Sequence, residues 1–359
     1  MAVSIESASG VRVVVGGRRL VSFAGCDSLG LARRREVVAA ARNVLAECGL
    51  GASASRTTTG TWDEHRDLER ALATWLGTED AVVLSSGWVA GQALAAGLAD
   101  YCDFTLLDAG AHPALADAAK LAGLPVRTFA HFDAAEARRA CDTGRPLVLT
   151  DGVDVAAGRV APLRALAALV AQRGGCMIVD DAHGIGVLGE RGRGTVDALG
   201  AAGPCVHTAG SLSKALGAHG GFVADTRAVC DRIRERYAGY AGGTPIPPST
   251  AAGAVAAVLI AAAGDDLRSN LRANARLLRR RFAEMGLPVP RPDLPWFSVS
   301  GRRGLAAASK RLARAGFLVP HLTYFGAPRG GYLKIAVTAA HTRDEIEALA
   351  VALRSALDV

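Results

Sequence analysis

The sequence has 359 residues, of which 50% are hydrophobic, and its formal net charge is +7. A chain of this length buries a sizeable core and favours more than one domain. Its 7 cysteines are scattered, and no two form a C-x-x-C pair. This pattern excludes a disulfide framework and a metal site, and it predicts reduced thiols and a cytoplasmic location. Residues 1–19 lack a signal-like leader, and the apolar run at 251–263 is short, so we expect no membrane association.

The positive charge gathers in two arginine clusters, at residues 33–35 and 279–281. Solvated helix faces are the simplest explanation of such clusters. The alternative is attraction for an anionic partner, such as coenzyme A or an acidic carrier protein. Nucleic-acid binding is not expected, since no aromatic-basic interleaving and no binding motif accompany the charge.

The N-terminal part begins with an alternating segment at residues 11–23, which predicts a β-hairpin. Residues 35–48 have helical periodicity, and this helix should end at Gly49. From residue 63 onward, short apolar segments alternate with helical stretches, which predicts βαβ units in a mainly parallel sheet covered on both faces. The expected strands are residues 81–84, 104–107, 126–129, 147–150, 177–180, 206–208 and 221–224.

The pattern changes after Pro247 and Pro248. Helices up to residue 263 and at 267–285 should precede a smaller α+β region, which ends in a helix from residue 342. Its expected strands are residues 296–299, 318–320 and 332–337. The sequence thus predicts an N-terminal hairpin-and-helix segment (residues 1–45), a large domain (46–248) and a small C-terminal domain (249–359).

One lysine, Lys214, lies among hydroxyl residues and glycines at residues 208–222. A lysine in such a turn is well placed to form a Schiff base with a carbonyl. Upstream, Asp180 ends an apolar strand, and His183 follows it. Pyridoxal 5′-phosphate (PLP) combines a lysine imine with a ring nitrogen that needs an acidic partner. We therefore expect a PLP site at the carboxyl ends of two strands, marked by Asp180 and Thr208.

Two further segments follow strands and suit the same cofactor. Ser86, Gly87 and Trp88 open a helix whose free N–H groups can bind a phosphate, although helix capping explains a Ser-Gly pair equally well. His112 fits an aromatic plate against the pyridine ring. The alternative is a histidine that caps a helix or lies in a surface loop.

With these residues in view, the chain resembles the α-oxoamine synthases, from about residue 23 to the C-terminus. The motifs that carry the resemblance are DDAHGIGVLG at residues 180–189, SLSKALG at 211–217, SR with HxxLE at 55–69, DGV with APL at 151–163, and TAAHT at 338–342. By motif, the 8-amino-7-oxononanoate synthase branch is the most similar. The resemblance implies an α/β fold, PLP fold type I, with a large, mainly parallel sheet domain and a smaller α+β domain.

The resemblance also implies roles for single residues. Lys214 would form the imine, Asp180 would contact the pyridine nitrogen, and His183 would contact its phenolic oxygen. His112 would stack on the ring. Ser211 replaces the family's usual phosphate-contacting threonine.

A homodimer with shared active sites is a further implication. Thr244 matches the threonine that reaches the phosphate in the partner subunit. The implied reaction condenses a small amino acid, alanine in the most similar branch, with an acyl thioester. It releases CO2 and a thiol, and the thioester can be carried by coenzyme A or by a carrier protein.

The expected contacts of the substrate carboxylate depart from the family pattern. Cys26, Val155 and Lys334 stand where the family has asparagine, serine and arginine, and Arg56 is a further expected substrate contact. A lysine holds a carboxylate as a point charge, without the two-pronged hydrogen bonding of arginine. Either the amino-acid pocket is remodelled, or Lys334 and a nearby donor still bind an ordinary amino acid.

Two other functions are compatible with parts of this pattern. One is an enzyme of the same fold that performs aldol cleavage or decarboxylation on a substrate without the standard carboxylate. The other is a non-catalytic protein of this fold with a regulatory or scaffolding role. The presence of Lys214, Asp180, His183 and His112 together disfavours the non-catalytic alternative.

Overall fold

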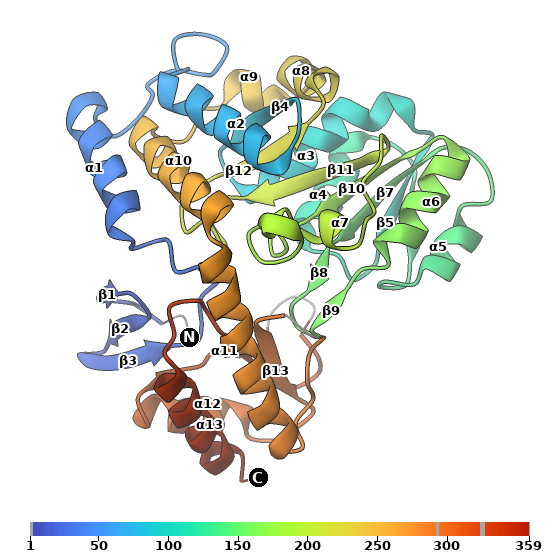
Figure 1. Cartoon of the computed structure of the whole chain (residues 1–359). Helices are drawn as coiled ribbons and strands as arrows, with labels where there is room; N and C mark the ends of the chain where they lie inside the picture. The colour runs from blue at the N-terminus through green and yellow to red at the C-terminus, as the bar shows by residue number, and fades with distance from the viewer. Residues whose placement is uncertain (1–2, 292–293, 324–326, 359) are drawn as a thin grey trace. The chain divides into compact units, whose positions relative to one another are not determined.

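The computed structural model describes residues 3–291, 294–323 and 327–358 (Figure 1). Its backbone contacts divide the chain into two compact units. The larger unit holds Arg35–Val153 and Val160–Gly264, and the smaller unit holds Met1–Arg34, Asp154–Arg159 and Asp265–Val359. Helices α1 (Arg35–Cys48) and α10 (Pro248–Ala263) belong to the larger unit, whereas the sequence-based division left them largely outside the large domain. That division stays a prediction.

A seven-stranded sheet forms the centre of the larger unit, in the order β4-β12-β11-β10-β7-β5-β6. Adjacent strands from β11 to β6 are parallel, and β12 is antiparallel to both of its neighbours. The strands are β4 (Asp80–Leu84), β5 (Phe104–Asp108), β6 (Val126–Phe129), β7 (Pro146–Asp151), β10 (Cys176–Asp180), β11 (Val206–Ser211) and β12 (Gly221–Asp225). Each of the seven expected strands is confirmed. The expectation that Thr208 ends a strand is wrong, because β11 continues to Ser211 by pairing with β12.

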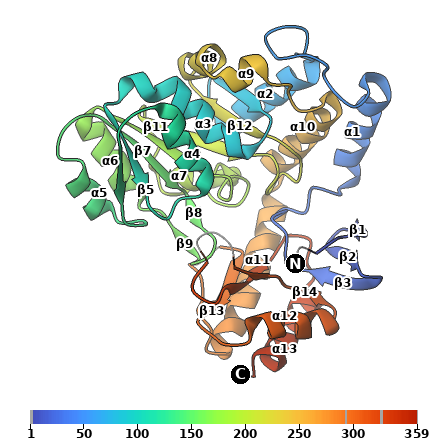
Figure 2. The same ribbon diagram turned by 180° about the vertical axis from the view of Figure 1, so that it is seen from behind.

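Helices cover both faces of this sheet (Figures 1 and 2). Leu147, Leu149 and Ile178 pack with α3 (Gly87–Leu98), α4 (Pro113–Ala122) and α8 (Arg227–Arg236) on one face. Val148 and Val179 pack with α5 (Ala134–Ala140) and α6 (Leu163–Arg173) on the other. Successive strand residues point to opposite faces, so two apolar layers require an unbroken apolar strand. The remaining helices are η1 (Ala99–Tyr101), α2 (Asp63–Leu76), η2 (Glu190–Gly192), α7 (Thr195–Ala198) and α9 (Ala238–Gly242).

Among its described residues, the smaller unit contains two short sheets and three helices. The expected hairpin is confirmed as β2 (Arg12–Val15) and β3 (Arg18–Ser22), and one sheet has the order β1-β2-β3-β14. The other has the order β13-β16-β15. The other elements are β1 (Ser7–Ser9), α11 (Asp265–Glu284), β13 (Trp296–Ser300), α12 (Leu305–Arg314), β14 (Phe317–Leu318), β15 (His321–Leu322), β16 (Tyr332–Ala336) and α13 (Arg343–Leu357). A two-stranded ribbon, β8 (Val153–Asp154) with β9 (Arg159–Val160), lies at the unit boundary in the sequence.

No single helix within the described ranges is long and apolar enough to cross a bilayer. The successive helices α10 and α11 reach the required length and apolar composition only when they are taken together, as a bent pair.

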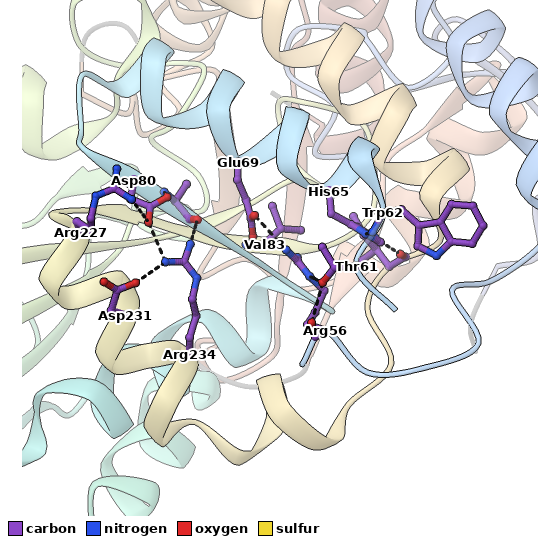
Figure 3. Close-up of polar contacts among 12 residues, drawn as sticks. Arg56, Thr61, Trp62, His65, Glu69, Asp80, Val83, Arg227, Asp231 and Arg234 are labelled. Atoms are coloured by element: carbon purple, nitrogen blue, oxygen red, sulfur yellow. Dashed lines mark hydrogen bonds and ion pairs between the residues drawn. The ribbon is translucent and has the colours of Figure 1, made fainter. Parts of the chain in front are cut away.

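Buried polar contacts attach α2 to β4 in the larger unit (Figure 3). Glu69 of α2 accepts the backbone N–H of Val83 at 3.0 Å, and its other carboxylate oxygen pairs with Arg56 Nη2 at 3.0 Å. Arg56 Nε donates to Thr61 Oγ1, also at 3.0 Å. Both charged side chains are buried, so each one depends on the other for its compensation.

Replacement of Glu69 by alanine should therefore destabilise the protein. The variant leaves the Arg56 guanidinium buried without its carboxylate and the Val83 N–H without its acceptor, at a cost of about 3 kcal/mol in the free energy of unfolding. Urea unfolding measures this change. Asp67→Ala, which removes a more exposed carboxylate from the same helix, is the matched control and should change stability by less than about 0.5 kcal/mol. Equal effects of the two substitutions would contradict the assignment.

In the smaller unit, a stacked histidine of the TAAHT motif joins the C-terminal part of the chain to the N-terminal part. The His341 ring lies parallel to Phe23, with 4.0 Å between ring centres. Its Nδ1 accepts the backbone N–H of Thr338 at 3.0 Å, so Nε2 carries the proton that it donates to the Ser22 carbonyl at 3.1 Å. These contacts need a neutral ring, and burial lowers the pKa of His341 from 6.5 to about 4.

This pKa shift predicts a loss of stability in acid. Because the folded-state pKa of His341 lies below that of the unfolded chain, the unfolded state binds more protons between pH 6.5 and about 4. Lowering the pH through this window should cost up to about 3 kcal/mol in the free energy of unfolding. His341→Gln should flatten the pH dependence in this window, as measured by urea unfolding at a series of pH values. Parallel curves for the wild type and the variant would contradict the assignment.

Candidate active site

The lysine turn lies between the antiparallel strands β11 and β12 of the larger unit. Two backbone hydrogen bonds close the turn, from Leu212 N–H to the Gly220 carbonyl at 3.0 Å and from Ala218 N–H to the Leu212 carbonyl at 2.9 Å. Within it, Lys214 is half-buried, and its Nζ lies 2.9 Å from Nε2 of His183. The structure thus brings together the two residues that the sequence predicted as the imine lysine and its neighbour.

Asp180 lies at the carboxyl end of β10, in register with Asp151 at the end of β7. Its Oδ1 accepts the backbone N–H of Ala182 at 3.0 Å. Burial raises the pKa of the Asp180 carboxyl, although the Ala182 hydrogen bond and the positive charges of Lys214 and His112 oppose the shift. A buried carboxylate is stabilised by an adjacent cation, which a protonated pyridine nitrogen supplies.

The neighbouring Asp181 has a different role. Its side chain is buried and accepts hydrogen bonds from both the backbone N–H and the hydroxyl of Thr195, the first residue of α7. A Cβ at Gly152 would lie only 2.7 Å from Asp181 Oδ1, so glycine in the DGV motif leaves room for this anchor. Asp181 therefore holds the loop that follows His183.

The start of α3 packs directly against the end of β11. A Cβ at Gly87 would lie 2.9 Å from both Cβ and Oγ of Ser211, and a Cβ at Gly221 would lie 2.2 Å from the Ser86 carbonyl oxygen. Ser211 Oγ is also 2.9 Å from Ser213 Oγ. Ser86 is the N-cap of α3, and its side chain makes no capping hydrogen bond. The helix start and these hydroxyls form a polar cradle that suits a phosphate.

His112 has the capping role that its sequence left open, and its stacking role stays a prediction. It is the N-cap of α4, where its Nδ1 accepts the Ala114 N–H at 3.2 Å. Its ring also meets the edge of Trp88, with 5.2 Å between ring centres. Burial lowers the pKa of His112, as does the charge of Lys214, while the nearby Asp180 raises it. The capping contact therefore accounts for the orientation of the His112 ring. The charges of Lys214 and Asp180 lie close enough to this ring to shift its pKa.

Sequence reasoning did not single out Asp151 as a site residue. Its Oδ2 accepts the backbone N–H of His112 at 2.8 Å, so it positions the histidine. The available signal was its place in the DGV motif, directly after an apolar strand.

The three altered carboxylate contacts gather in the smaller unit. Lys334 Nζ donates to Cys26 Sγ at 3.4 Å, and on the neighbouring strand Ser298 is the register partner of Lys334. Ser298 Oγ donates to the Ala156 carbonyl at 2.6 Å, which holds the half-buried segment containing Val155. Motif comparison did not single out the Ser298 hydroxyl, because it lies on a different strand from Lys334.

Two predicted residues lie elsewhere in the larger unit. Arg56 is engaged by Glu69 and Thr61 in the buried contacts of Figure 3, and its Nη1 is buried with no hydrogen-bond partner within the described residues. Thr244 is exposed in the segment between α9 and α10. Their roles toward a substrate and toward a partner subunit stay predictions. No group of three or more metal-ligating side chains occurs in the part of the chain that the structure describes.

Comparison with known proteins identifies the family. The model of aminotransferase class I and II matches residues 20–353. The 8-amino-7-oxononanoate synthases of Xanthomonas axonopodis pv. citri (strain 306) and Halorhodospira halophila (strain DSM 244 / SL1) are each 36% identical to the chain. The matches cover 98% and 95% of this chain and 89% and 86% of those proteins, respectively. The chain belongs to this family, and within it to the α-oxoamine synthases.

Solved structures of this family agree with that assignment. The serine palmitoyltransferase of S. paucimobilis, solved with a bound PLP–myriocin aldimine, superimposes with a TM-score of 0.93 at 26% identity, covering 99% of this chain and 92% of that one. An 8-amino-7-oxononanoate synthase from Francisella tularensis has the same fold, with a TM-score of 0.80 at 23% identity over 94% of this chain and 97% of that one. This α-oxoamine synthase is thus a PLP-dependent acyltransferase of PLP fold type I, as its motifs predicted.

The residues present fit PLP. Lys214 has its amine beside a histidine, Asp180 offers a half-buried carboxylate, and a Cβ at Gly87 would fill the cradle beside Ser211. These residues can hold the carbonyl carbon, the ring nitrogen and the phosphate, respectively.

Substitution of Gly87 by alanine should weaken cofactor binding. The added Cβ would meet Ser211 at 2.9 Å and push the hydroxyl and the helix start apart, so we expect at least about a tenfold increase in the dissociation constant for PLP. Absorbance titration of the apoenzyme with PLP measures it. Gln92→Ala, on the same helix, should leave the constant unchanged. Equal PLP affinity in the Gly87→Ala variant and the wild type would contradict the cradle.

Proposed function

We propose that this protein condenses a small amino acid with an acyl thioester, with loss of CO2 and free thiol, to give an α-amino ketone. The observation that carries the proposal is the 2.9 Å contact between Lys214 Nζ and His183 Nε2 beside the carboxyl end of β10, in a chain of this family. Alanine and a pimeloyl thioester are the first substrates to test, because several relatives are named 8-amino-7-oxononanoate synthases.

PLP, when bound, supplies an electron sink for the pair of electrons released at the α-carbon of the amino acid. The residues of the chain provide proton transfer and orientation. Lys214 is the base that removes the α-proton, and His183 holds its amine in a fixed direction by the contact at Nζ. Asp180 contributes a negative charge at the ring nitrogen, which favours the protonated ring.

His112 contributes a rigid aromatic surface to this site. Its ring orientation is fixed by the Ala114 N–H at Nδ1, and its backbone is fixed by Asp151. Burial lowers the pKa of His112, which favours the neutral form of a ring next to the positive charge of Lys214.

The amino-acid carboxylate is assigned to Lys334 by the resemblance. A compact ammonium attracts a carboxylate without fixing its orientation. Ser298 is the neighbouring hydroxyl, and it could donate to that carboxylate only by releasing the Ala156 carbonyl. The Cys26 contact of Lys334 is weak, because sulfur is a poor acceptor, and a carboxylate can replace it. The local-compensation hypothesis, in which an ordinary amino acid still binds, is therefore our first choice.

A second candidate function rests on the same contact. If Lys334 stays bound to Cys26, the pocket lacks a free cation for the carboxylate. The protein would then be an enzyme of this fold that performs aldol-type or decarboxylative chemistry on another substrate. Release of thiol from an acyl thioester distinguishes the two functions, because only the acyltransferase consumes a thioester.

We further propose that the enzyme works in the cytoplasm as a homodimer with shared active sites. The exposure of Thr244 supports this arrangement, because a residue that reaches a partner's phosphate must lie at the surface of the isolated chain. The donor is an acyl group on coenzyme A or on a carrier protein, and the net positive charge suits either anionic carrier.

The function is tested by incubating the holoenzyme with alanine, glycine or serine and a set of acyl-CoA and acyl-carrier-protein donors. We expect thiol release together with a product mass equal to amino acid plus acyl group minus CO2, and loss of both in Lys214→Ala. No thiol release with any pair, from an enzyme that binds PLP, would overturn the acyltransferase assignment and favour the second candidate.

Lys334→Ala should raise the KM for the amino acid about tenfold or more and change kcat less, because the lost charge attracts the carboxylate in the ground state and in the transition state alike. Steady-state kinetics with the best amino acid measures this change. Lys310→Ala, an exposed lysine of α12 in the same unit, is the matched control and should leave KM unchanged. An unchanged KM in Lys334→Ala would contradict the role of Lys334.

A further inference from the structure

His65 is a fully buried histidine of α2, in the larger unit, and the reaction proposed above does not use it. Its Nδ1 accepts the backbone N–H of Trp62 at 3.1 Å, so the proton of a neutral ring lies on Nε2. Nε2 donates this proton to the carbonyl oxygen of Ile246, at 2.7 Å. Burial lowers the pKa of His65, which favours the neutral ring, although the Ile246 hydrogen bond opposes the shift. Both ring nitrogens are thus engaged.

The acceptor, Ile246, lies in a segment that has little freedom to adjust. Pro247 and Pro248 follow it, and their rings fix the backbone at the start of α10. A residue before a proline is itself restricted to extended conformations. The Ile246 side chain is buried. A shift of the Ile246 carbonyl therefore moves its side chain as well, because no flexible residue absorbs the change.

The Ile246 side chain packs directly on the lysine turn. A Cβ at Gly220 would lie 3.2 Å from Ile246 Cγ2 and 3.0 Å from Leu212 Cδ1. Gly220 has a φ of +125°, which residues with a side chain rarely adopt. Its carbonyl accepts the Leu212 N–H that closes the turn around Lys214. A methyl group of Ile246 thus covers the backbone at the point where the turn is closed.

Two further contacts hold the preceding helix α9. Thr57 Oγ1 donates to the Ala241 carbonyl at 3.2 Å, and the guanidinium of Arg56 lies over the Tyr240 ring, 5.4 Å from its centre. Neither of these contacts involves Ile246 or the lysine turn. The hydrogen bond from His65 therefore differs from them, because it holds the residue that packs against Gly220.

We propose that His65 is a positioning residue for Lys214 and that it acts through Ile246. The hydrogen bond at Nε2 fixes the Ile246 carbonyl, and the Ile246 methyl group fixes Gly220. Gly220 in turn closes the loop that carries Lys214. The proposal rests on the proposed function, in which Lys214 forms the imine with PLP, and it adds a residue outside the cofactor site to that function.

Hydrogen exchange of the full-length enzyme, before PLP is added, tests this connection directly. The N–H groups of Leu212, Gly217 and Ala218 are hydrogen-bonded within the turn, so their exchange reports its opening in peptides that cover residues 210–222. His65→Phe keeps an aromatic ring but removes the donor, and these groups should then exchange about tenfold faster. His65→Gln, whose amide can donate to the same carbonyl, should restore most of the protection. Wild-type exchange of the turn in a folded His65→Phe variant would overturn the proposal.

Two controls separate this effect from a general loss of stability. Thr57→Ala removes the hydrogen bond to Ala241 and should leave the exchange of the turn unchanged. Peptides from β5 and β7, which are separated from β11 by β10 or by more of the sheet, should exchange at the wild-type rate in every variant. If these strands lose as much protection as the turn in His65→Phe, the histidine only stabilises the larger unit, and the proposal is wrong.

Ile246→Ala breaks the same connection from the other end. It leaves the backbone carbonyl that accepts from His65 in place, and it provides the test if His65→Phe does not fold. The turn should again exchange faster. The double variant should exchange about as fast as the faster of the two single variants, because both residues act in one series of contacts. Effects that multiply in the double variant would show that the two residues act independently, against the proposal.

PLP binding tests the consequence for Lys214. Absorbance follows binding to the full-length enzyme, and borohydride reduction with mass spectrometry locates the modified lysine. In His65→Phe and Ile246→Ala the dissociation constant for PLP should rise about fivefold or more, whereas His65→Gln should remain within about twofold of the wild type. Unchanged PLP affinity in a variant whose turn has loosened would contradict the positioning role. Modification of another lysine in the wild type would instead overturn the imine role of Lys214, and the proposed function with it.

Discussion

The common direction of strands β5, β7, β10 and β11 is the constraint on which the chemistry of this protein depends. It brings Asp151, Asp180 and Ser211 to one edge of the sheet, where the helices α3 and α4 also begin. Ionisable side chains, hydroxyls and free N–H groups therefore lie close together at this edge, and no long loop is needed to bring them there. The lysine turn can occupy the same edge only because β12 reverses direction and returns the chain across the sheet.

The opposite edge of the same sheet has a different chemistry. There the strands start, with Cys176 as the first residue of β10 and Cys205 directly before β11, and His207 Nδ1 lies 2.8 Å from Asp225 Oδ2. β10 carries Asp180 at one end and Cys176 at the other, with buried apolar residues between them.

The cofactor residues and the substrate residues of this enzyme follow different rules. Lys214, His183 and Asp180 keep the family motifs, and the larger unit brings Lys214 and His183 together beside the strand that ends at Asp180. In the smaller unit, Lys334, Cys26 and Ser298 form a cluster that the family motifs do not describe. Under the proposed function, this cluster would contact the amino-acid substrate, whereas the cofactor chemistry belongs to the larger unit.

The sequence by itself determined the secondary structure and the family. Apolar strands, glycine-flanked turns and helix caps are local signals, so the seven strands of the large sheet, the N-terminal hairpin and the helix at Arg35–Cys48 could all be predicted. The motif around Lys214 likewise predicted the cofactor. Sequence reasoning was less successful where a boundary depends on a neighbour, as in β11, which extends to Ser211 because it pairs with β12.

Only the tertiary structure decided which side chains meet. The guanidinium of Arg56 pairs with Glu69 on α2, a contact that the motifs did not indicate. Ser298 beside Lys334 has no signature in the sequence, because its position follows from the pairing of β13 with β16. Contacts of this kind depend on strand order and register, which long-range burial sets and which no local pattern encodes.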